Sequence, residues 1–126
     1  MAGRFLGINV RSTISEPFAD LIVDGLKTIE TRESNSLHPY VGKRIAIVRT
    51  GEGKAFAIGE VTITGFMWTN SKSTFDNYAP LHMVNKENAF YIKQSIGKYM
   101  YFLENAVRYQ TPVAVGKGIV ARQLIY

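Results

Sequence analysis

The sequence predicts a small α+β domain in which five to six strands form a curled sheet or barrel. One helix follows the first strand, and a helical insertion precedes the last two strands. The length of 126 residues suits a single domain spanning residues 1–126. Short runs rich in β-branched residues lie between turn-forming residues, and one early segment has the apolar spacing of a helix. These three observations together predict the fold class.

The first strand and the first helix are predicted from two different apolar spacings. Residues of Phe5–Arg11 alternate between apolar and other types, which is typical of a strand. In Ser15–Asp24, Phe18, Leu21 and Ile22 repeat at helical spacing, and the serine can act as the N-cap. The glycine that follows this segment is a natural end for the helix.

The remaining strands are predicted from apolar or β-branched runs bounded by turn residues. The predicted strands are Lys27–Arg32, Lys43–Thr50, Ala55–Trp68, Tyr99–Tyr109 and Ile119–Tyr126. We expect a bulge near Gly59, an interruption at Pro112 with a short edge after it, and a turn at Gly116–Gly118. Residues 69–80 are polar and predict a loop, whereas Leu81–Ile96 predicts helix.

Composition excludes several classes of site. The chain contains no cysteine, so disulfides, thiolate metal sites and cysteine nucleophiles are absent. No Asp or Glu lies at metal-ligand spacing from either histidine, His38 or His82, so we expect neither a metal nor another cofactor. No apolar run is long enough to cross a bilayer, and no apolar signal segment follows the first residues. We therefore expect a cytoplasmic protein without a membrane partner.

The positive charge of the chain is concentrated in its second half. The net charge is +5, of which residues 61–126 contribute +4, and the same residues hold eleven of the fifteen aromatic side chains. Cations neutralise phosphates and aromatic rings stack on bases, so this combination suits a nucleic-acid partner. Two other interpretations remain: the rings fill a β-rich core while the lysines keep the domain soluble, or the aromatic surface binds a protein.

One short segment combines three charged residues at close spacing. Lys27, Glu30 and Arg32 follow the predicted end of the first helix. In a regular strand Lys27 points away from Glu30 and Arg32, but a chain still turning out of the helix brings all three to one pocket mouth. A carboxylate held between two cations presents both an acceptor and donors to a small polar ligand. The alternative is a solvated strand face with a weak surface ion pair.

This segment resembles the signature of the ASCH superfamily, whose pattern Gly-x-Lys-x-x-Glu-x-Arg is met by Gly25, Lys27, Glu30 and Arg32. A second similarity lies in the late strand, in Tyr99–Asn105, Val107–Tyr109 and Pro112-Val113. The resemblance implies a PUA-like β-barrel with a pocket rimmed by the charged motif. It also implies that the ligand is RNA or a modified nucleoside.

The resemblance leaves enzymatic activity open. Some similar small proteins are N4-acetylcytidine amidohydrolases, and Lys27 matches their lysine, but Glu30 stands where they have a nucleophilic threonine. Thr28 and Thr31 flank that position, and a hydroxyl one residue away points to the opposite face of a strand. An enzyme of this type would use Lys27 with Glu30 or with Glu87. Other similar proteins cleave single-stranded RNA, so a nuclease is a further alternative.

Five other residues are candidates for ligand binding. Arg11 and Ser12 end the first strand where the helix is expected, a place suited to an anion. Thr28 shares its predicted strand face with Glu30, and Trp68 lies where the long strand ends and can stack on a base. Asn105 lies among apolar residues, where a buried amide needs hydrogen-bond partners and can read a ligand edge. Each also has an ordinary structural interpretation.

Overall fold

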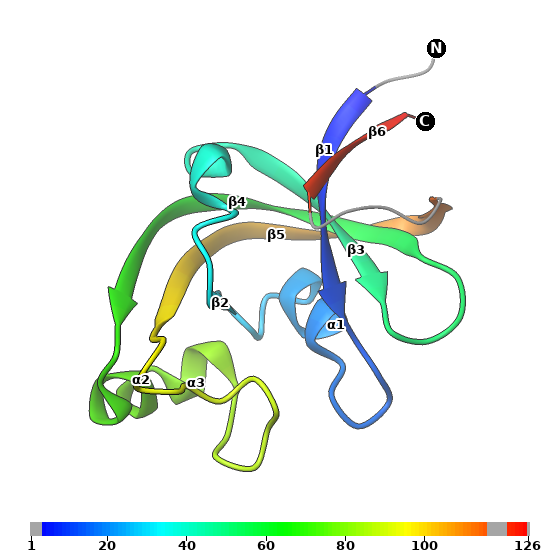
Figure 1. Ribbon diagram of the computed structural model, residues 1–126. Helices are drawn as coiled ribbons and strands as arrows, with labels where there is room; N and C mark the ends of the chain where they lie inside the picture. Colours follow the sequence, from blue (N-terminus) through cyan, green and yellow to red (C-terminus); the bar gives the residue numbers. More distant parts are fainter. Residues whose placement is uncertain (1–3, 116–120, 126) are drawn as a thin grey trace.

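The computed structural model describes residues 4–115 and 121–125, which form one curved, mixed sheet with short helices beside it (Figure 1). The strand order is β2-β5-β4-β3-β1-β6. The strands are β1 (Arg4–Arg11), β2 (Ile29–Arg32), β3 (Arg44–Thr50), β4 (Phe56–Thr69), β5 (Lys98–Ala114) and β6 (Ala121–Ile125). Strands β1 and β3 are parallel, and all other neighbours are antiparallel.

The α+β class and all six strands are confirmed. The long strands β4 and β5 bend together across the molecule in Figure 1 and give the sheet its curl. Among the described residues no pairing joins the two end strands, β2 and β6, so closure into a barrel stays a prediction. The predicted turn at Gly116–Gly118 and the ends of the predicted last strand, residues 119, 120 and 126, lie outside the described residues.

The predicted bulge near Gly59 is confirmed, and the predicted break at Pro112 is wrong. The pairing of β4 with β5 shifts between Ala57 and Gly59, where Arg108 and Val113 are the partners on β5. Pro112 lies inside this irregular stretch. Its missing N–H therefore removes no bond from the ladder, and β5 continues through it.

The predicted helix after the first strand is confirmed as α1 (Phe18–Val23), but it is shorter than expected. Pro17 occupies the N-cap position and makes no side-chain cap bond, so the predicted cap at Ser15 is wrong. The helix buries its apolar stripe against β3 and β4. It ends at Gly25, whose φ of +78° is the left-handed conformation that ends many helices.

The insertion between β4 and β5 is only partly helical. The helices are α2 (Lys72–Asn77) and α3 (Ala79–His82), and a short 3-10 helix, η1 (His38–Tyr40), lies elsewhere, between β2 and β3. Helix α2 therefore falls in the predicted loop, where Ser71 caps it by accepting a bond from the Thr74 N–H at 3.2 Å.

The predicted helix over Leu81–Ile96 is wrong beyond His82. Met83 adopts a left-handed conformation with φ of 62° and ends α3. Asn85 and Asn88 then accept bonds from backbone N–H groups two residues ahead, at 3.1 and 2.7 Å. Such local side-chain bonds hold the backbone in turns and compete with a helix.

The core lies inside the curl of the sheet, and α1 contributes to it. Its fully buried members include Ile8, Ile22, Ile47, Ile63 and Tyr101. No helix within the described residues is long and apolar enough to cross a membrane.

Candidate functional site

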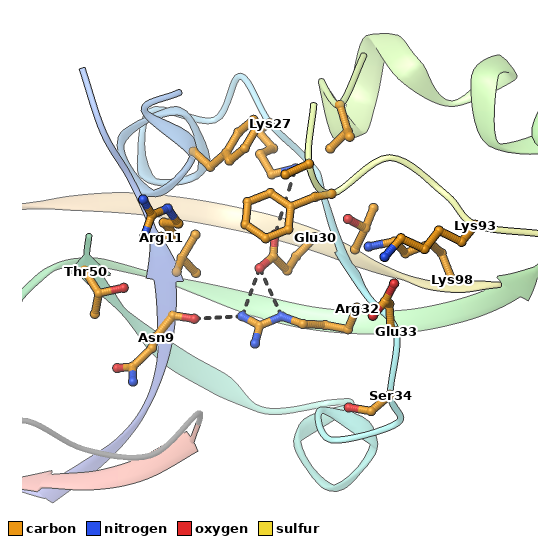
Figure 2. A pocket seen from close by; sticks show the side chains of 16 residues that line it. Asn9, Arg11, Lys27, Glu30, Arg32, Glu33, Ser34, Thr50, Lys93 and Lys98 are labelled. Atoms are coloured by element: carbon orange, nitrogen blue, oxygen red, sulfur yellow. Dashed lines mark hydrogen bonds and ion pairs between the residues drawn. The ribbon is translucent and has the colours of Figure 1, made fainter. Parts of the chain in front are cut away.

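A cavity of about 710 Å³ opens between the sheet and the insertion. Its walls come from β1, from the segment leading into and through β2, from α1 and from the turns after α3 (Figure 2). The lining residues are Asn9, Val10, Arg11, Phe18, Lys27, Glu30, Thr31, Arg32, Glu33, Ser34, Thr50, Val84, Ala89, Phe90, Lys93 and Lys98. The charged motif of the sequence therefore lies in a concave site.

Lys27 joins Glu30 and Arg32 because it precedes the strand. After Gly25 the chain is still turning, and the Lys27 N–H donates to the Leu21 carbonyl at 3.0 Å. Strand β2 begins only at Ile29, so regular alternation does not apply to Lys27. Of the two arrangements left open by the sequence, the structure has the one in which all three charges meet.

The three charges form a network that is more deeply buried than a pocket rim. Lys27 is 1% exposed and Glu30 is 7% exposed. Arg32 donates from Nε and Nη2 to Glu30 Oε2 at 3.1 and 2.9 Å, and Nη2 also donates to the Asn9 carbonyl at 2.8 Å. Lys27 Nζ lies 3.9 Å from Glu30 Oε1 and donates to the His82 carbonyl. The motif thus forms the floor of the cavity.

Burial lowers the pKa of Lys27 to about 8, since the low-dielectric surroundings disfavour its charged form. The Glu30 carboxylate opposes this shift, whereas Arg32 and Lys98 add to it. The Lys27 ammonium also lies 4.9 Å from the centre of the Phe18 ring, a cation–π distance. Lys27 therefore loses its proton far more easily than an ordinary lysine.

This shift predicts that stability increases with pH above about 8. Between a folded pKa of about 8 and the ordinary value of 10.5, the unfolded chain keeps the Lys27 proton and the folded chain does not. The free energy of unfolding then rises by up to about 3 kcal/mol across this range. Urea unfolding at several pH values between 7 and 10 measures it, with Lys27→Met expected to lack this contribution. The exposed Lys43→Met control retains the wild-type slope, and parallel curves for wild type and Lys27→Met would contradict the assignment.

His82 is a buried neutral imidazole that supports the lysine. Its Nε2–H donates to the Phe75 carbonyl at 2.7 Å, and its Nδ1 accepts from the Val84 N–H at 2.9 Å. Burial is the largest cause that lowers its pKa, and the charge of Lys27 adds to it. Both ring nitrogens are therefore engaged in holding the turn whose carbonyl receives Lys27. No group of three or more metal-ligating side chains occurs in the part of the chain that the structure describes.

The cavity is strongly cationic. Five of its lining side chains are basic and two are acidic. In the view of Figure 2, Arg11 lies on one side of the Glu30–Arg32 pair, and Lys93 and Lys98 lie on the other, near Glu33. The rings of Phe18 and Phe90 supply apolar wall.

Two of the predicted ligand-binding residues, Ser12 and Thr28, do not line the cavity, whereas Arg11 does. Ser12 is buried, and its hydroxyl donates to Asp20 Oδ2 at 3.3 Å. Thr28 uses its backbone to connect the insertion to the sheet, donating to the Leu81 carbonyl at 3.0 Å and accepting from the Leu103 N–H at 2.9 Å. Both residues stabilise the site from outside it.

Trp68, Asn105 and Glu87 also lie away from the cavity. The Trp68 ring rests against Gly97 and stays 47% exposed, so it is a surface ring. Asn105 is exposed rather than buried, and its φ of 55° places it at a bulge of β5, a conformation that asparagine tolerates. Glu87 is exposed on a separate, smaller hollow and does not meet Lys27.

Sequence reasoning missed several lining residues, chiefly Asn9, Thr31, Phe90 and Lys98. Strand alternation places Thr31 on the face away from Glu30, yet both residues line the cavity, at the end strand β2. Lys98 begins β5 immediately after a glycine, and its local sequence carries no signal for a cavity residue. Phe90 lies in the segment 81–96, which the sequence predicts as a helix but which forms turns after His82.

Comparison with solved structures identifies the fold. Crystal structures of an ASCH protein from Zymomonas mobilis match this chain with a TM-score of 0.69 at 22% identity, covering 86% of this chain and 71% of that one. This chain has the ASCH-domain fold. A serine-to-alanine variant of that protein matches with a TM-score of 0.67 at 20% identity over 88% and 72% of the two chains. A tyrosine-to-phenylalanine variant matches with a TM-score of 0.68 at 20% identity over 88% and 74%.

The similarity to the ASCH structures is a similarity of the fold. No family model matches the sequence, and no curated protein does. The resemblance of the short charged motif and the late strand to the ASCH superfamily is nevertheless confirmed at the level of the fold. In the structure the motif lies between α1 and β2 and continues into β2.

Proposed function

We propose that the cavity binds RNA or a nucleoside, with the Lys27–Glu30–Arg32 network as its polar floor. The observation that carries this proposal is the combination of that buried network with an excess of basic side chains and two phenylalanine rings in one cavity. The cationic side chains bind phosphates, the aromatic rings stack on bases, and a fixed carboxylate accepts hydrogen bonds from base N–H groups.

The geometry of Glu30 supports recognition of a base edge. Both Arg32 bonds go to Oε2, whereas Oε1 faces Lys27 at 3.9 Å, beyond hydrogen-bond distance. Oε1 can therefore accept from an amino group of a ligand while Arg32 holds the carboxylate in place. A volume of about 710 Å³ is within the range of small-molecule sites and accommodates a nucleoside.

Binding to single-stranded RNA is expected to weaken when Arg11 or Phe90 is truncated, but with different salt dependence. Both side chains are exposed at the cavity, so their loss leaves the buried network intact. Arg11→Ala removes one cation and lowers the salt slope by about 1, whereas Phe90→Ala weakens stacking with little change in slope. Fluorescence anisotropy with a short labelled RNA across a salt series measures both effects.

The matched control is Lys43→Ala, which removes an exposed cation away from the cavity. Its affinity is expected to stay within about twofold of wild type. If no RNA or nucleoside binds at low salt, or if Arg11→Ala and Lys43→Ala behave alike, the cavity is not the binding site.

A hydrolase acting on N4-acetylcytidine is a second candidate, because Lys27 has a pKa of about 8 and the Thr31 residue also lines the cavity. A neutral lysine can take a proton from a hydroxyl or from water, and Glu30 lies beside it. Chromatography measures the release of cytidine from N4-acetylcytidine. Release by the wild type that is lost in Lys27→Met would support this candidate. Cleavage of a single-stranded RNA substrate by the same groups is tested in parallel on gels.

A further inference from the structure

Lys98 is a largely buried lysine at one end of the cavity. Its residue is 3% exposed, and it lines the cavity at the start of β5. Among the described residues its ammonium makes no hydrogen bond and no ion pair within 4.0 Å. The nearby carboxylates of Glu33 and Glu30 attract it only from farther away.

The contrast with Lys27 makes this state unusual. Lys27 is also buried, but it has the His82 carbonyl and Glu30 as partners. Burial lowers the pKa of Lys98, and Glu33 and Glu30 oppose this lowering from beyond ion-pair distance. Lys93 also lines the cavity and its charge adds to that lowering, so the positive charge at this end is doubled.

We infer that the ligand carries a phosphate group, and that Lys98, together with Lys93, binds it at this end of the cavity. The inference rests on the proposed function and deepens it, because it names a nucleotide rather than a nucleoside as the ligand. A phosphate supplies the anionic acceptor that Lys98 lacks, and its oxygens accept charge-assisted hydrogen bonds from lysine ammonium groups.

The cavity then has two functional ends. Glu30 faces the base, while Lys98 and Lys93, which lie to one side of the Glu30–Arg32 pair in Figure 2, face the phosphate. The phosphate can belong to a free mononucleotide or to an RNA strand. Glu33 shares this end and competes with the ligand for Lys98.

Titration calorimetry with the full chain tests the inference, using the four common ribonucleosides, their 5′-monophosphates and a short single-stranded RNA. We expect the best monophosphate to bind about 10-fold to 100-fold more tightly than its nucleoside. Lys98→Met is expected to abolish this difference, whereas Glu33→Gln is expected to increase it. Lys98→Met removes a charge without a close partner and keeps an apolar side chain, so the variant is expected to fold, and thermal unfolding checks this.

Each outcome separates the inference from the proposed function. If a nucleoside and its monophosphate bind equally to the wild type, or if Lys98→Met weakens both equally, the phosphate site is wrong and the nucleoside site stands. If no nucleoside, monophosphate or RNA binds, both proposals are wrong. Tight binding of RNA with weak binding of every monophosphate assigns the phosphate to a strand. The matched control, Lys43→Met, is expected to retain the wild-type difference.

Discussion

Glu30→Ala is expected to lower the free energy of unfolding by about 3 to 5 kcal/mol, because it leaves two buried cations without their shared carboxylate. Arg32 loses both side-chain bonds to Oε2, and Lys27 loses the carboxylate 3.9 Å away. The side chains of Lys27, Glu30 and Arg32 are 1%, 10% and 17% exposed, so water replaces little of what is lost.

An exposed ion pair provides the matched control for Glu30→Ala. Asp24 Oδ1 lies 2.8 Å from Arg108 Nε, but the Asp24 side chain is 46% exposed. Without Asp24, Arg108 retains its ion pair with Asp20, whose Oδ1 lies 3.0 Å from Nη2. Asp24→Ala is therefore expected to cost less than about 1 kcal/mol. Glu30→Gln retains the shape and an acceptor without the charge, and is expected to fall between the two.

Urea unfolding of these variants at pH 7 measures the differences, with RNA binding as a second readout. Equal losses for Glu30→Ala and Asp24→Ala would show that the buried network contributes no more than a surface pair. A stable Glu30→Gln that no longer binds RNA would separate the ligand-binding role of the carboxylate from its structural role.

Gly59→Ala is expected to cost about 3 kcal/mol, because no space exists for a side chain at this point of β4. A Cβ atom there would lie 2.4 Å from the Val107 carbonyl oxygen and 2.6 Å from Val23 Cγ1. The first contact is with backbone of the neighbouring strand, so a rotamer change cannot relieve it. The second is with α1, which rests on the strand at this glycine and continues into the Lys27 segment.

Gly65→Ala on the same strand is the control for this substitution. A Cβ there meets only Phe102 Cδ2 at 3.9 Å, an ordinary contact. Its effect on the free energy of unfolding is expected to stay within about 1 kcal/mol. Similar midpoints in urea for the two variants would contradict the close packing of α1 on β4.

Local patterns were sufficient for most of the strands and for α1. The alternation in β1 and the helical stripe of α1 each mark the buried face of a single element. A short stretch of sequence is therefore enough to predict them. Local patterns predicted the wrong structure for most of the insertion between β4 and β5. Asn85 and Asn88 bond to backbone N–H groups two residues ahead, and apolar residues placed by such turns imitate a helical pattern.

The order of the strands and of α1, the cationic character and the charged motif can be read from the sequence, since these depend on residue type and local spacing. Which charges share a cavity follows from the folded structure alone, because the lining residues come from segments far apart in the chain. Lys98, at the start of β5, lines the same cavity as Lys27 from the segment before β2, whereas Trp68 and Asn105 lie outside it. Burial is likewise a property of the assembled fold. It converts Lys27 from an ordinary lysine into a group with a pKa of about 8.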